Sequence, residues 1–234
     1  MKTMAAKKRV TLATFDGRLM DGLKFCKNVY DMFEQLRSEP NGISKLRMRP
    51  TKEEKRLTEE LIDIARYVQA RYMIGRCIKV RWRGGSQPYD AVLLSSGAAV
   101  ENGFARRKVL LEVTKAVHQN EYLVRELINK GKPSFGVKGA SRDKTTKEVT
   151  STPYGRQGDE AIADLAEQIL ERLVSKAANP YPPNTVLLIS CVPNTAILAE
   201  EWLEAIARVK AVGVEHPFCE VFVLCGPRNE CATI

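Results

Sequence analysis

Three strand-like segments follow one another in the middle of the chain, and their spacing restricts the fold more than any other feature. Residues 77–83 (CIKVRWR) alternate apolar and basic side chains, as a strand with one buried face does. Residues 89–95 (YDAVLLS) and 108–116 (KVLLEVTKA) are rich in residues that favour β-structure. Because short connections place successive strands side by side, we expect the three segments to form a meander within one sheet.

Helical patterns stand on both sides of these strands. Thr51 and Glu54 have the spacing of a capping box, and apolar residues then recur at helical intervals up to Tyr72. On the same helix, Glu60 is expected on the solvated face. Further elements are expected as helices at 119–130, 159–177 and 196–211 and as strands at 185–190 and 219–225. The late strand–helix–strand unit adds parallel strands, so we predict an α/β (α+β) fold with a central mixed β-sheet, an αβββαβ core and flanking helices.

Two changes of character along the chain suggest its organisation. Residues 1–50 are predicted to form an N-terminal helical extension, and residues 51–234 one α/β domain. Residues 131–158 are rich in Gly, Ser, Thr and Pro and form a basic loop within that domain. A loop of this length is usually functional or disordered. Contacts with phosphate or gating of a substrate are one interpretation, and a solvated flexible loop is the other.

The charge balance favours a polyanionic partner. Lys and Arg number 37 against 28 Asp and Glu, which gives a net charge of +9. Contacts between basic side chains and phosphates release counterions, so DNA is the expected partner and RNA the alternative, although solubility alone also explains such a charge. A homodimer is left open.

Other features of composition concern location. The N-terminus lacks the apolar segment of a secretory signal, and no stretch approaches the ~18 apolar residues that span a bilayer, so no membrane partner is expected. The six cysteines are scattered and include no CxxC pair. Reduced, mostly buried thiols in a cytoplasmic protein explain them best.

Two acidic residues in adjacent strand segments suggest chemistry. Asp90 opens the second segment, and Glu112 lies inside the apolar third segment, where a carboxylate needs a partner. Facing side chains on neighbouring antiparallel strands lie ~5 Å apart, close enough to share a metal ion. Mg²⁺ (or Mn²⁺) often uses only one or two carboxylates together with phosphate and water.

The order α-β-β-β-α-β, with Pro88-Tyr89-Asp90 in the second strand and Glu112-Val113-Thr114-Lys115 in the third, resembles the PD-(D/E)xK, or restriction-endonuclease-like, nuclease superfamily. The resemblance covers about residues 51 to 190. It implies Asp90 and Glu112 as metal ligands and Lys115 as the residue that orients the attacking water or stabilises the phosphorane. It also implies that Gln119, at the start of the next helix, assists.

The chain departs from the family pattern at the lysine. Thr114 occupies the lysine position, and Lys115 comes one residue late, on the opposite face of a regular strand. A β-bulge after Glu112 would turn Lys115 into the site. Otherwise another base serves, or hydrolysis has been lost and only binding remains.

Each candidate also has a structural interpretation. Glu112 could form an ion pair with Arg81 or Arg83, Asp90 could cap a turn, and Tyr122 has the spacing of a core or interface residue. The predicted function is a metal-dependent nuclease or nuclease-derived DNA-processing protein, and the alternative is a non-catalytic nucleic-acid-binding or protein-interaction module. The basic residues expected to contact nucleic acid are Lys79, Arg81, Arg83, Lys138, Arg142 and Lys144.

Overall fold

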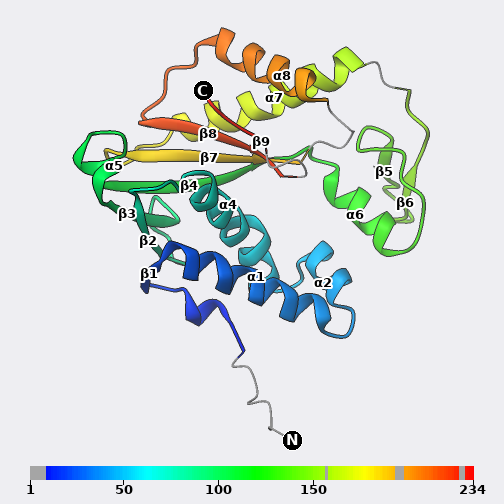
Figure 1. The fold of residues 1–234 in the computed structure, drawn as a ribbon. Helices are drawn as coiled ribbons and strands as arrows, with labels where there is room; N and C mark the ends of the chain where they lie inside the picture. The colour runs from blue at the N-terminus through cyan, green and yellow to red at the C-terminus, as the bar shows by residue number, and fades with distance from the viewer. Residues whose placement is uncertain (1–8, 156–157, 193–197, 227–229) are drawn as a thin grey trace, which may run out of the picture. The chain divides into compact units, whose positions relative to one another are not determined.

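The computed structural model describes residues 9–155, 158–192, 198–226 and 230–234. The chain divides into two compact units, whose helices and strands are labelled in Figure 1. The first runs from the N-terminus to Lys108, and the second from Val109 to Ile234. The domain boundary expected at residue 50 stays a prediction. Helix α1 precedes residue 50 and α4 follows it, and the two helices pack against each other inside the first unit.

The first unit is a layer of helices on a small antiparallel sheet. Strands β1, β2 and β3 are adjacent and antiparallel, with Val80 opposite Leu93 in the β2–β3 pair. The predicted capping box of Thr51 and Glu54 is confirmed at the start of α3. The elements of the unit are η1 (Leu12–Thr14), β1 (Leu19–Asp21), α1 (Gly22–Ser38), α2 (Gly42–Met48), α3 (Lys52–Arg56), η2 (Leu57–Leu61), α4 (Ile62–Ala70), β2 (Cys77–Trp82), β3 (Ala91–Ser96) and α5 (Ala98–Glu101).

The apolar side chains that alternate along strand β2 form part of the core of this unit. Ile78, Val80 and Trp82 are fully or almost fully buried, as the sequence pattern predicts. The indole Nε1 of Trp82 donates a hydrogen bond of 3.0 Å to Oε2 of Glu60. Glu60 is therefore buried and ion-paired with Arg56, and the expectation that it lies on a solvated face is wrong. The carboxylate is retained in the core because Trp82 and Arg56 satisfy it.

The second unit is a mixed sheet with two long helices. Strand β4 starts at the boundary and runs parallel to β7, which runs parallel to β8, while β9 closes the edge antiparallel to β8. A separate two-stranded hairpin, β5–β6, lies beside helix α6. The elements are β4 (Lys108–Ala116), α6 (Glu121–Asn129), β5 (Ala140–Arg142), β6 (Val149–Ser151), α7 (Gly158–Ala177), β7 (Thr185–Cys191), α8 (Ala199–Val212), β8 (Glu220–Cys225) and β9 (Glu230–Thr233).

Helices α7 and α8 cover one face of this sheet. Ile169 of α7 and Trp202 of α8 are buried in one cluster with Ala116, Leu187 and Val223 from the strands. Strand β7 is buried along its whole length, as expected of a central parallel strand. The protein is thus an α/β protein with a mixed sheet and flanking helices, as predicted. In the described part of the chain, no helix is long and apolar enough to span a membrane.

The cysteines are free thiols in different environments. Cys26 is buried and its Sγ donates to the carbonyl of Ala65, whereas Cys77 and Cys231 are exposed. Burial raises the pKa of the Cys26 thiol from 9.0 to about 11, and a hydrogen bond with the backbone of Cys26 itself opposes that shift in part.

This contrast predicts the order of alkylation. At pH 8, iodoacetamide should modify Cys77 and Cys231 well before Cys26, because only the thiolate reacts and the Cys26 thiol is both protonated and covered. Since the raised pKa means that the folded state holds this proton more tightly, its contribution to stability should fall as the pH rises from 9 towards 11. Peptide mass spectrometry of native and urea-unfolded protein measures the order, and equal native rates would contradict it.

Candidate functional site

Glu112 is the acidic residue that lies deepest in the second unit. It is buried in strand β4, on the same face as Ala116, which packs into the cluster under α7 and α8. Its Oε1 accepts a hydrogen bond of 2.5 Å from Nζ of Lys176, in the last turn of α7. The hydroxyl of Tyr181 lies 3.5 Å from the same oxygen. The carboxylate is therefore ionically satisfied, but its partner is Lys176 in place of Arg81 or Arg83.

The residues after Glu112 follow a regular strand. Leu110 to Ala116 pair with Thr185 to Cys191 without a break in register. With no bulge in this pairing, Thr114 shares the face of Glu112, and Lys115 points to the opposite face. The structure thus does not bring Lys115 to Glu112, and the lysine that reaches this carboxylate is Lys176.

Sequence reasoning missed Lys176, although a signal for it was present. Ile169 and Leu173 belong to the buried stripe of α7, and Lys176 follows at the next helical interval. A lysine on the buried side of a helix end indicates a buried acidic partner.

Asp90 lies in the first unit, immediately before strand β3, and is half-buried. Its carbonyl accepts a hydrogen bond of 2.9 Å from the backbone N–H of Arg83, which extends the β2–β3 pairing past Trp82 and Ala91. Lys79 and Arg81 share the face of Arg83. The predicted basic face of β2 therefore forms, with Lys79 and Arg83 exposed and Arg81 half-buried.

The two acids thus belong to different compact units. Among the described residues, no group of three or more His, Cys, Asp or Glu side chains could hold a metal ion. Mg²⁺ needs fewer protein ligands than that, because one or two carboxylates together with water and phosphate can hold it. Carboxylate oxygens are the ligands that this ion prefers. Each of the two residues carries such oxygens, and Oε1 of Glu112 is already bound by Lys176.

A polar pocket of about 430 Å³ lies at the carboxyl end of β4, where α/β proteins commonly bind ligands. It brings together two residues predicted from the sequence, Gln119 and Lys138. Lys138 is held there by Asp164 at 2.9 Å. Glu112 is not among the lining residues, which are Val117, His118, Gln119, Lys138, Asp164, Glu167, Gln168, Glu171 and Arg172.

The basic loop contains more structure than its composition suggests. Strands β5 and β6 form a hairpin inside it, with Ala140 opposite Ser151. Arg142 of β5 forms an ion pair of 2.5 Å with Glu126 of α6, and Lys144 is exposed in the turn. These basic residues are attached to a folded hairpin.

Helix α6 buries only part of its predicted apolar side. Leu123 and Leu127 pack against Ala140 and Val149 of the hairpin. Tyr122, expected in a core or interface, is 56% exposed and so does not lie in the core. The short apolar stripe of α6 covers only the small hairpin, so the tyrosine stays at the surface.

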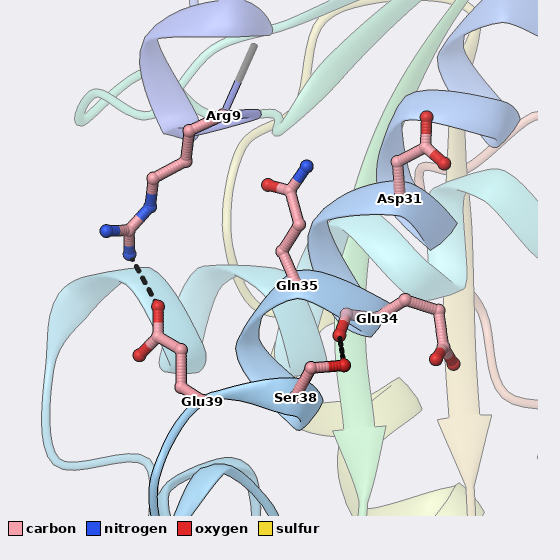
Figure 2. A pocket seen from close by; sticks show the side chains of 6 residues that line it. All are labelled: Arg9, Asp31, Glu34, Gln35, Ser38 and Glu39. Carbon is pink, nitrogen blue, oxygen red and sulfur yellow. Dashed lines mark hydrogen bonds and ion pairs between the residues drawn. The ribbon is translucent and has the colours of Figure 1, made fainter. Parts of the chain in front are cut away.

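A second polar pocket lies on α1 in the first unit (Figure 2). Two of its acids have basic partners: Asp31 pairs with Lys27, and Glu34 with Arg37. The lining residues are Arg9, Asp31, Glu34, Gln35, Ser38 and Glu39.

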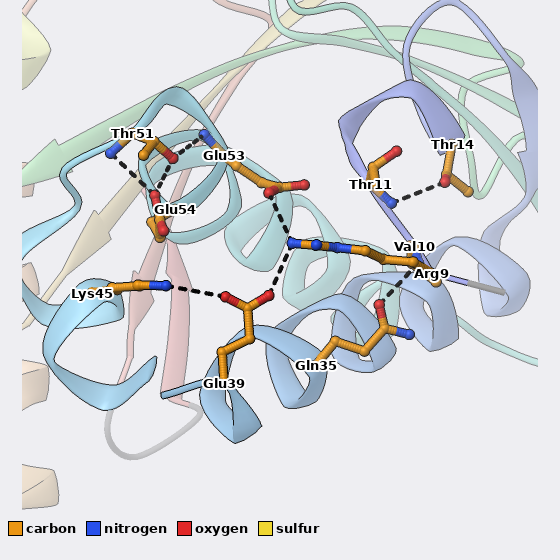
Figure 3. Close-up of polar contacts among 10 residues, drawn as sticks. All are labelled: Arg9, Val10, Thr11, Thr14, Gln35, Glu39, Lys45, Thr51, Glu53 and Glu54. Carbon is orange, nitrogen blue, oxygen red and sulfur yellow. Dashed lines mark hydrogen bonds and ion pairs between the residues drawn. The ribbon is translucent and has the colours of Figure 1, made fainter. Parts of the chain in front are cut away.

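Side chains around this pocket also bind the first described residues to the helices of the first unit (Figure 3). Arg9 reaches Glu39 at 2.9 Å and Glu53 at 3.7 Å, and Glu39 also binds Lys45 at 3.2 Å. The backbone N–H of Val10 donates to the side chain of Gln35, which holds the same segment at a second point. These contacts hold Arg9 and Val10 against helices α1 and α3, which indicates a structural role.

Comparison of the chain with protein-family models, with curated proteins and with solved structures gave no match.

Proposed function

We propose that this protein is a divalent-metal-dependent nuclease that hydrolyses phosphodiester bonds in DNA. The observation that carries the proposal is Glu112, a buried carboxylate in a central strand held by Lys176. A carboxylate with an adjacent ammonium group suits phosphodiester chemistry, because the first can bind a cation and the second can neutralise phosphate charge. Asp90 stays the second ligand predicted from the sequence.

Each residue has a role in this proposal. Glu112 would bind Mg²⁺ or Mn²⁺, which when bound would activate water and offset the negative charge of the phosphate. Asp90, in the first unit, keeps the role of metal ligand that the sequence predicts for it. Lys176 would have the role that the sequence predicts for Lys115, because its Nζ contacts Glu112. The basic face of Lys79, Arg81 and Arg83 would contact the nucleic-acid backbone.

The net charge of +9 supports a polyanionic substrate, and the free thiols support a cytoplasmic location.

A nicking assay tests the proposal. Supercoiled plasmid and labelled oligonucleotides are incubated with the protein and Mg²⁺ or Mn²⁺, and with EDTA as a control. We expect metal-dependent cleavage that falls by at least about 100-fold in Asp90→Asn and in Glu112→Gln, because each removes a charged ligand. Glu101→Gln, a surface substitution, should retain activity. The proposal would be overturned if both variants cleaved DNA as fast as the wild type, or if the wild type cleaved no substrate.

A second candidate function, nucleic-acid binding without cleavage, is favoured by one observation. Thr114 lies on the face of Glu112 where the family pattern has lysine, and Lys115 lies on the other. Salt-sensitive binding with no metal-dependent cleavage is the result expected for this candidate.

A further inference from the structure

We infer that helix α6 and hairpin β5–β6 carry a binding site for single-stranded nucleic acid, built from exposed aromatic rings between basic side chains. We call Tyr122, Phe135, Lys138, Arg142 and Tyr154 the aromatic–basic patch. The inference deepens the proposed function by naming a single strand as the substrate. The binding site is argued from the patch itself, and only its use by a nuclease rests on the proposed function.

Three large rings are exposed in this part of the chain. The exposed fractions are 56% for Tyr122, 48% for Phe135 and 47% for Tyr154. Exposed aromatic rings are enriched at interaction sites. Three rings around one small hairpin provide faces on which bases can stack.

Two of the rings have a cation beside them. The guanidinium of Arg142 lies 5.9 Å from the centre of the Tyr122 ring, and Nζ of Lys138 lies 5.8 Å from that of Tyr154. The backbone N–H of Phe135 donates to Ser151 of β6 at 2.9 Å, which fixes the third ring beside the hairpin. A ring next to a cation serves a base and its phosphate together.

The scaffold under the patch holds these groups in place. The side chain of Asn120 donates to the carbonyls of Val137 and Ala140, which ties the start of α6 to the hairpin. Glu126 binds both Lys130 and Arg142, and these hydrogen bonds lower the pKa of its carboxyl. The ionised Glu126 therefore orients Arg142 throughout the neutral pH range.

The region carries an excess of positive charge beyond Lys138 and Arg142, which are ion-paired with Asp164 and Glu126. Residues 121–155 contain 7 Lys and Arg against 4 Asp and Glu, a net charge of +3 in 35 residues. Lys144 and Lys147 are exposed in the hairpin turn, where Asp143 accepts hydrogen bonds from the N–H groups of Thr145 and Thr146. Basic side chains thus continue from the rings to the tip of the hairpin.

The rings favour a single strand over a duplex. In a duplex the faces of the bases are covered by their neighbours, whereas unpaired bases can stack on aromatic side chains. Lys138 also lines the polar pocket beside Gln119, so the patch adjoins a cavity at the end of β4.

Binding measured without metal tests this inference. Fluorescence anisotropy with a labelled single-stranded oligothymidylate, a single-stranded RNA and a DNA duplex is recorded in EDTA. We expect tighter binding of the single strands, and about 5-fold or greater weakening for each of Tyr122→Ala, Phe135→Ala and Tyr154→Ala. Tyr122→Phe should bind like the wild type because it keeps the ring. Phe104→Ala, which removes a ring that is 79% exposed in the first unit, is the matched control and should have no effect.

Salt dependence separates stacking from charge. Lys144→Ala with Lys147→Ala should lower the slope of log affinity against log salt by about 0.7 for each phosphate that is no longer neutralised, whereas the ring variants should keep the wild-type slope. Equal affinity for duplex and single strand, or unchanged binding in the three ring variants, would overturn the inference. Ring-dependent binding of single strands without metal-dependent cleavage by the wild type would refute the nuclease proposal alone.

Discussion

Replacing Lys176 with alanine is expected to lower the free energy of unfolding by about 2–3 kcal/mol. The variant leaves the Glu112 carboxylate buried without its cation, and removing one partner of a buried pair costs up to about 3–5 kcal/mol. We expect less than the maximum because the side chain of Lys176 is 29% exposed, whereas that of Glu112 is 11% exposed. Urea unfolding followed by circular dichroism measures the change.

A double-mutant cycle isolates the cause. Glu112→Gln in the Lys176→Ala background should recover part of the loss, because a neutral amide needs no counter-charge. Tyr181→Phe is the matched control and should change stability by under about 1 kcal/mol, since its hydroxyl is 3.5 Å from Glu112. A loss below about 0.5 kcal/mol for Lys176→Ala would mean that the pair behaves as an ordinary surface salt bridge.

The regular elements of the fold could be predicted because their periodicity is local. The third strand was predicted at 108–116 and is observed as Lys108–Ala116, and α7 differs from its predicted range by one residue. Strand β2 ends one residue earlier than predicted, at Trp82. In each case a continuous pattern of burial along the segment determines the element.

The short elements could not be predicted, because long-range pairing creates them. Strands β5 and β6 contain three residues each and occur in a segment of Gly, Ser and Thr, and β1 and β9 exist only as edges paired to longer strands. The partner of Glu112 was missed for the same reason. The sequence indicates that a buried acid needs a cation, but only the packing of α7 on β4 selects Lys176, 64 residues away.

Replacing Gly139 with alanine is expected to have the largest effect on the hairpin. A Cβ atom at this position would lie 2.2 Å from the carbonyl oxygen of Thr152, and backbone atoms cannot yield as a flexible side chain can. The backbone N–H of Thr152 donates to the carbonyl of Gly139 at 3.1 Å, next to the first pair of β5–β6. The clash should break this hydrogen bond and cost about 3 kcal/mol, the upper range for overpacking.

The effect should be confined to the hairpin and the aromatic–basic patch, because the small cluster of α6 and the hairpin is separate from the main core under α7 and α8. Hydrogen exchange should accelerate at residues 140–151 but not in β7, and single-strand binding should weaken along with it. Gly155→Ala is the matched control, since a Cβ there meets no atom within 4 Å, and its effect should stay within about 0.5 kcal/mol. Normal exchange in the hairpin of Gly139→Ala would contradict the prediction, and faster exchange with unchanged binding would show that the single strand binds elsewhere.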